Sequence, residues 1–131
     1  MMKSNIATYR FQSARLLSAG VKPETADMYW DNYNTIWAAA FKDCARKSEN
    51  GFAPAWSLSA LLTKVLPSEI SRDATGYGLK IFCKDDMQNG IAWEIFYTDD
   101  MFVSASDPIE ACVRMVEKLH ANGHPLNQTE V

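Results

Sequence analysis

Two pairs of neighbouring aspartates, Asp85-Asp86 and Asp99-Asp100, are the residues of this sequence most suited to chemistry. Carboxylate oxygens are the ligands that hard divalent cations prefer. The apolar run 91–98 lies between the pairs, and as a strand its eight residues, at about 3.3 Å each, would hold them about 26 Å apart. One ion cannot bridge that distance. We therefore expect solvated turn acids, and no metal or cofactor site.

Histidines and cysteines offer no stronger site. Gly123 separates His120 from His124, and a histidine near a helix C-terminus is stabilised by the helix dipole without any catalytic role. The cysteines are three, an odd number, widely spaced within apolar segments and outside any C-x-x-C pattern: Cys44, Cys83 and Cys112. We expect all three to be free, buried thiols in a reducing compartment, the cytoplasm.

Sequence motifs for other chemistries are absent. The chain contains no G-x-S-x-G, Walker, Rossmann, EF-hand, zinc-finger or RNP-type pattern. The short segment Gly76-Tyr77-Gly78 leads into an apolar, β-rich run, whereas phosphate-binding loops lead into helices. A catalytic residue is therefore not assigned.

Aromatic residues are concentrated between positions 29 and 37. Tyr29, Trp30, Tyr33 and Trp37 lie within nine residues, and the whole chain contains four tryptophans. Core packing would account for such residues, but Trp and Tyr are also the side chains that most often anchor protein interfaces. If they are exposed together, these four residues are the candidate partner-binding patch.

The N-terminal third of the sequence indicates helices. An apolar face over residues 4–19 predicts a first helix ending at Gly20, and Pro23 suits the first position of a second. Three- and four-residue spacing of apolar residues continues to about residue 47, which predicts one long helix. The aromatic and β-branched residues at 33–37 fit a strand about equally well, so the pattern leaves residues 34–50 open between helix and strand.

The middle and C-terminal segments give clearer local signals. Ser57 is a suitable N-cap for a third helix, Leu58 to Leu66, which Pro67 ends. Residues 68–76 are predicted to be irregular. Three strands, 77–84, 91–98 and 101–105, are predicted to form an antiparallel meander. A final helix covers it, with Asp107 as N-cap, Pro108 at its first position and Asn122-Gly123 at its end.

These elements predict an α+β fold, in which a small antiparallel meander of three or four strands packs against three to four helices. Residues 1–121 would form a single domain and residues 122–131 a polar tail. The 131-residue chain has 47% hydrophobic residues, enough for a core without disulfides or metals. Its formal charge of -3 disfavours nucleic acid and anionic lipid as partners, and no apolar run approaches the ~20 residues of a membrane span.

Four stretches of the sequence carry a resemblance to known proteins: residues 15–20, 23–28, 54–62 with Leu66-Pro67, and 105–112. The most specific is Pro54-Ala55-Trp56-Ser57-Leu58-Ser59-Ala60-Leu61-Leu62. In these stretches the chain resembles short, functionally uncharacterised proteins encoded by prophages and mobile elements of gut bacteria. The resemblance implies a genetic context in which small acidic proteins bind a host or phage protein. It implies no activity and no catalytic residues.

We therefore expect a non-enzymatic protein-interaction module with an unidentified protein partner. A homodimer is compatible with the same reading. Two alternatives stay open: a small enzyme or ligand sensor whose site joins residues distant in sequence, such as a cysteine with His120, and a nucleic-acid-binding accessory protein. The last would use basic residues in the first half of the chain, namely Arg10, Arg15, Lys22, Lys42, Arg46 and Lys47.

Overall fold

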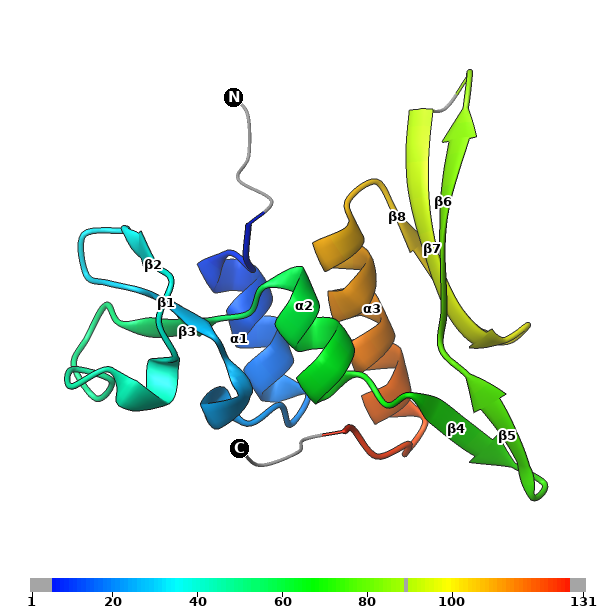
Figure 1. The fold of residues 1–131 in the computed structure, drawn as a ribbon, viewed down its shortest axis with the longest axis horizontal. Helices are drawn as coiled ribbons and strands as arrows, with labels where there is room; N and C mark the ends of the chain where they lie inside the picture. Colours follow the sequence, from blue (N-terminus) through cyan, green and yellow to red (C-terminus); the bar gives the residue numbers. More distant parts are fainter. Residues whose placement is uncertain (1–5, 89, 128–131) are drawn as a thin grey trace.

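The computed structural model describes residues 6–88 and 90–127. Within them the chain is α+β, as predicted, but it has eight strands in three antiparallel sheets where three or four strands were expected. The three helices are α1 (Arg10–Ser18), α2 (Leu58–Ala60) and α3 (Pro108–Ala121). They lie between a small sheet, β2-β1-β3, at one end of the molecule and the sheet β6-β7-β8 at the other (Figure 1).

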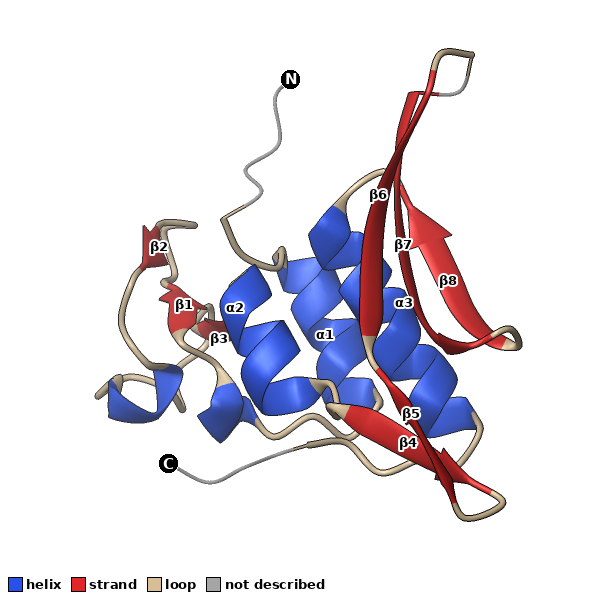
Figure 2. Cartoon of the chain, turned by 45° about the vertical axis from the view of Figure 1, so that its right-hand side comes forward, coloured by secondary structure: helices blue, strands red, loops and turns tan. Residues whose placement is uncertain are grey.

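The C-terminal sheet confirms the predicted meander. Its strands are β6 (Lys80–Asp86), β7 (Gly90–Thr98) and β8 (Met101–Ala105), paired in the order β6-β7-β8. One face of this sheet lies against α3 (Figure 2). Alternate side chains of β7 and β8 enter the core on that face, including the fully buried Ile95 and Tyr97. Asn89, part of the predicted hairpin turn, lies outside the described residues.

The last helix begins and ends where its capping residues predict. The Asp107 carboxylate accepts a hydrogen bond from the backbone N–H of Glu110 at 2.9 Å, and Pro108 occupies the first turn. Asn122 caps the C-terminus, and Gly123 follows with φ +76°. The predicted apolar stripe of α3 is buried, at no more than 1% exposure: Ile109, Cys112, Val113, Val116 and Leu119.

For the middle of the chain, one prediction is confirmed and another is wrong. Ser57 caps the third helix by accepting from the N–H of Ala60 at 3.1 Å; the helix continues beyond α2 as a π-helical turn, Leu61–Val65. Residues 68–76, expected to be irregular, belong mostly to a hairpin of β4 (Glu69–Arg72) and β5 (Thr75–Gly78). Asp73 and Ala74 both have positive φ at its turn. Alanine rarely adopts a positive φ, so this turn had no clear signal in the sequence.

The prediction of one long second helix was wrong. After a single 3-10 turn at Pro23–Thr25 the chain forms β1 (Met28–Trp30) and β2 (Ile36–Trp37), a second 3-10 turn at Phe41–Asp43, and β3 (Ala53–Ala55). The strand alternative for the aromatic segment was therefore the better one. Asn34, at φ +62°, turns the chain between β1 and β2, and a helix cannot continue through that conformation.

The first helix is shorter than predicted and begins at Arg10. Of the predicted start, Ser4 and Asn5 lie outside the described residues, and Ala7 forms an isolated antiparallel bridge with Ser57. Gly20, with φ +90°, follows the helix end as expected. One core cluster runs from Leu16 to Leu119, and the partly buried Leu126 packs against it from beyond the predicted domain boundary at residue 121.

Candidate functional site

Three of the four predicted aromatic residues gather on one surface. The rings of Tyr29 and Trp37 are stacked, with centroids 6.3 Å apart and planes 15° from parallel, and Phe52 lies 6.2 Å from Tyr29. Tyr33 is 82% exposed and Trp37 49% exposed. Together with parts of the neighbouring loops, these four residues line a shallow hollow of about 230 Å³. We call Tyr29, Tyr33, Trp37 and Phe52 the aromatic surface.

Trp30, the fourth predicted residue, does not belong to this surface. Side chains alternate between the two faces of a strand, so Trp30 points away from Tyr29. It packs against a small cluster formed by Ala7, Met28 and Ala55, and its indole N–H donates to the Thr8 carbonyl at 2.9 Å. Its role is structural, and its inclusion in the predicted binding patch is not supported.

Asp31 organises the loop that carries the exposed aromatics. Its carboxylate accepts hydrogen bonds from the backbone N–H groups of Tyr33 and Thr35, at 2.8 and 2.9 Å, and from the Trp37 indole N–H at 2.8 Å. The hydrogen bond from Trp37, followed by that from Thr35, lowers the pKa of Asp31 below its ordinary value. The charged carboxylate therefore holds the Trp37 ring in place by accepting a hydrogen bond from the indole N–H, the only polar group of the ring.

Arg10 joins this loop to the helical core. From the first position of α1, its guanidinium donates to Asn34 Oδ1 at 2.8 Å, to the Asp31 carbonyl, and to the Gly51 carbonyl at 2.5 Å. The loops on both sides of the aromatic surface are thus fixed by one side chain. Sequence reasoning named Arg10 only as a basic residue for the nucleic-acid alternative and did not name Phe52, and nothing in their local sequence indicates that they meet residues 31–37.

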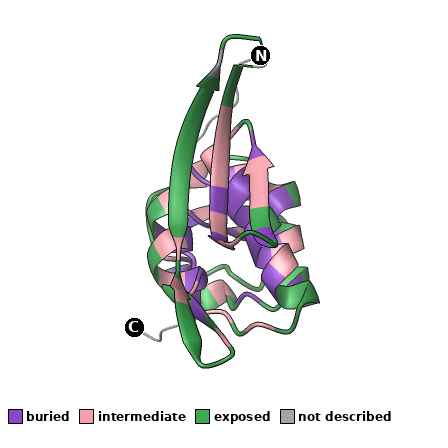
Figure 3. Ribbon diagram, turned by 90° about the vertical axis from the view of Figure 1, so that its right-hand side faces the viewer, coloured by how far each residue is buried: buried purple, intermediate pink, exposed green. Residues whose placement is uncertain are grey.

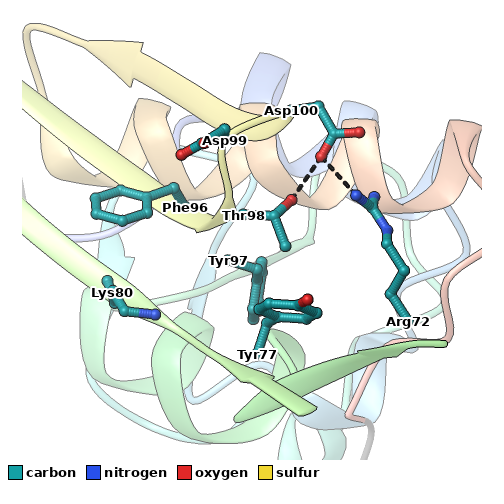
Figure 4. Close-up of a pocket in the computed structure, with 8 residues that line it drawn as sticks. All are labelled: Arg72, Tyr77, Lys80, Phe96, Tyr97, Thr98, Asp99 and Asp100. Atoms are coloured by element: carbon teal, nitrogen blue, oxygen red, sulfur yellow. Dashed lines mark hydrogen bonds and ion pairs between the residues drawn. The ribbon is translucent and has the colours of Figure 1, made fainter. Parts of the chain in front are cut away.

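A second hollow, of about 550 Å³, lies between the β4-β5 hairpin and the turn joining β7 to β8. Figure 4 shows Arg72 and Lys80 lining it together with Tyr77, Thr98 and Asp100. Arg72 pairs with the Asp100 carboxylate at 2.9 Å, and Thr98 donates to the same oxygen at 2.6 Å. Lys80 donates to the Gly78 carbonyl at 3.1 Å.

Within this second hollow Arg72 and Asp100 are thus paired with each other, and Lys80 donates to a backbone carbonyl. The hydrogen bonds from Thr98 and Arg72 lower the pKa of Asp100 to about 2, so its carboxylate stays ionised at neutral pH. An anionic ligand would have to compete with that carboxylate for Arg72. The hollow therefore has less to offer a ligand than its volume suggests, and the ligand-sensor alternative gains no support from it.

The cysteines and histidines do not assemble a nucleophile. Cys112 is fully buried, and burial, with a smaller contribution from Asp107, raises the pKa of its thiol to about 12. His120 is exposed two helical turns further along α3. Cys44 is buried, but Cys83 is exposed on β6, which corrects the expectation that all three thiols are buried. Among the described residues no three His, Cys, Asp or Glu side chains are grouped to hold a metal ion.

The three arginines named for the nucleic-acid alternative form internal contacts. Arg15 forms ion pairs with Glu110 at 2.9 Å and Glu117 at 2.6 Å, joining α1 to α3, and Arg46 lies 3.7 Å from Glu49. Arg10 is held by the loops described above. A phosphate-binding face needs cations that are free to replace counterions, so these contacts do not favour the nucleic-acid alternative.

The four sequence stretches 15–20, 23–28, 54–62 and 105–112 are joined by contacts inside the molecule. The Trp56 indole N–H donates to Thr25 Oγ1 at 2.9 Å, and the Ser57 hydroxyl and N–H both donate to the Asp27 carboxylate, at 2.5 and 2.9 Å. The ion pair of Arg15 with Glu110 joins two further stretches. These residues build the scaffold and lie outside the aromatic surface.

Comparisons with known proteins add no family or relative. Protein-family models, curated proteins and solved structures all give no match to the chain. No helix in the described residues has both the length and the apolar character needed to cross a membrane.

Proposed function

We propose that the protein is a small, non-enzymatic protein-interaction module that binds an extended, proline-containing segment of a partner through its aromatic surface. The observation that carries the proposal is the exposure of Tyr33 and Trp37 beside the stacked ring of Tyr29. Flat aromatic rings arranged along a shallow hollow are suited to pack against proline rings.

The polar groups of the site favour this kind of ligand over a strand. The Trp37 indole N–H is already bonded to Asp31, which leaves the ring face for apolar contact. The adjacent edge strand, β2, contains only two residues and offers little backbone for strand addition. Arg46 also lines the hollow, in an exposed pair with Glu49 at 3.7 Å, so an acidic residue beside the proline would share the charge of Arg46 with Glu49.

The sequence resemblance supplies the setting of this proposal. It would make the partner a host or phage protein in the cell of a bacterium that carries the mobile element. The enzyme alternative has less to support it, because the potential nucleophiles and the histidines lie apart.

Binding to an array of proline-containing peptides, followed by titration of the best peptides by fluorescence polarisation, tests the proposal. We expect Tyr33→Ala and Trp37→Ala each to weaken binding by at least about tenfold, since exposed aromatic anchors commonly contribute that much. Phe11→Ala is the matched control, because Phe11 is 74% exposed on α1, outside the aromatic surface. Equal binding by the Trp37→Ala variant and the wild type would contradict the proposal.

A further inference from the structure

The two outer edges of the β6-β7-β8 sheet differ in how they are protected. On β8, side chains of α3 donate hydrogen bonds to backbone carbonyls. Arg114 donates to the Ser104 carbonyl at 2.6 Å, and Lys118 donates to the Phe102 carbonyl at 3.2 Å. β6 is the opposite edge, and in the described part of the chain it pairs only with β7. Unpaired strand edges are templates for pairing with another chain.

β6 is also exposed on its two faces. Figure 3 shows it as an exposed edge along nearly its whole length, in contrast to β7 beside it. Phe82 is 56% exposed on the outer face of the sheet. Ile81 and Cys83 are exposed on the opposite face, the one that packs against the core further along the sheet. A seven-residue strand with apolar side chains and a free edge is long enough to form a stable pairing.

We propose that two copies of this chain associate through their β6 edges, in antiparallel register about a two-fold axis at Cys83, to form one continuous six-stranded sheet. The sequence of β6, Lys-Ile-Phe-Cys-Lys-Asp-Asp, is basic at its start and acidic at its end. Antiparallel self-pairing centred on Cys83 places Lys80 opposite residue 86 and Ile81 opposite Asp85. The basic start of one β6 strand thereby lies beside the acidic end of the other.

The lysines on this edge are compatible with pairing in this register. Edge lysines usually discourage strand addition, because like charges meet when such strands pair. Here Lys84 lies opposite Phe82 of the second copy, where an ammonium group can rest on an aromatic ring. No lysine of one copy faces a lysine of the other in the register centred on Cys83.

Sedimentation velocity over a concentration series, under reducing conditions, tests the association. We expect a monomer–dimer equilibrium. Phe82→Lys should raise its dissociation constant by about tenfold or more. In the dimer each new lysine at position 82 would face Lys84 of the other copy, so the two-fold symmetry creates two like-charged pairs. Phe11→Lys is the matched control, since it adds the same charge at an exposed aromatic position away from β6. The double variant Phe82→Lys/Lys84→Glu should restore association by making those pairs opposite in charge.

Cross-linking then identifies the interface. Cys83 is the exposed cysteine of the three, and residues opposite each other in antiparallel strands have Cα atoms about 5 Å apart. A short bis-maleimide should therefore link two copies, and Cys83→Ser should abolish the link while leaving sedimentation unchanged. A chain that stays monomeric at its highest soluble concentration overturns the proposal. So does a dimer that Phe82→Lys leaves intact or that Cys83 does not cross-link.

Discussion

Replacing Thr25 by valine tests how the most distinctive sequence stretch stabilises the fold. Thr25 Oγ1 accepts from the indole N–H of Trp56 at 2.9 Å and donates to the Lys22 carbonyl at 2.7 Å. Trp56 is completely buried. Valine keeps the shape of threonine but leaves the indole N–H without an acceptor, away from water. Leaving a buried donor unsatisfied costs about 1–3 kcal/mol, so we expect a loss of about 2 kcal/mol.

Urea and thermal unfolding monitored by tryptophan fluorescence measure this loss. With an unfolding entropy of about 2.1 cal/mol/K per residue, a 2 kcal/mol change lowers the Tm of a chain this long by about 7 °C. Thr25→Ser keeps the hydroxyl and removes one methyl group, so it should cost no more than about 1 kcal/mol. In a Trp56→Phe background no indole N–H remains, and Thr25→Val should then cost little. An equal cost in both backgrounds would refute the reasoning.

Three further predictions concern charges and thiols. Burial opposes ionisation of Glu110, but hydrogen bonds from arginine and glutamine side chains outweigh it and lower its pKa. The ionised carboxylate therefore contributes to the free energy of unfolding at neutral pH, and this contribution is lost as the pH falls below about 4.5. Glu110→Gln should remove that part of the pH dependence of urea unfolding. Asp31→Asn should increase quenching of Trp37 fluorescence by iodide, because the amide offers Trp37 a donor where the carboxylate accepted its N–H; unchanged quenching would show that Asp31 does not hold the ring. In native protein, Cys83 should react with a thiol reagent at least about a hundredfold faster than Cys112, because the Cys112 thiol is buried and its pKa is raised, and comparable rates would contradict the burial seen in the structure.

The aromatic surface shows how far a candidate site can be predicted without coordinates. Aromatic density alone selected Tyr29, Tyr33 and Trp37, which do gather together. It also selected Trp30, because a strand of three residues carries no periodicity that separates its two faces. Phe52 and the role of Arg10 at this site were missed, since the two residues lie 15 positions after and 21 positions before residues 31–37.

The C-terminal helix and meander were determined by the sequence itself. A capping aspartate, a proline in the first turn and a glycine after the last turn act within a few residues, so α3 follows from its own sequence. Apolar, β-rich runs separated by turn residues likewise predicted β7 and β8, although the bounds of β6 shifted by a few residues.

Only the tertiary structure decided the course of residues 23–55. Their apolar spacing fits a helix, but the pairing of β1 with β3, the clamp of Arg10 and the buried contact of Thr25 with Trp56 join residues more than twenty positions apart. Such contacts override local propensity, which amounts to a few tenths of a kcal/mol per residue, about 0.7 at most for ordinary residues. The exposure of Cys83 was decided in the same way, because it depends on how far β6 extends beyond the helix that covers its neighbours.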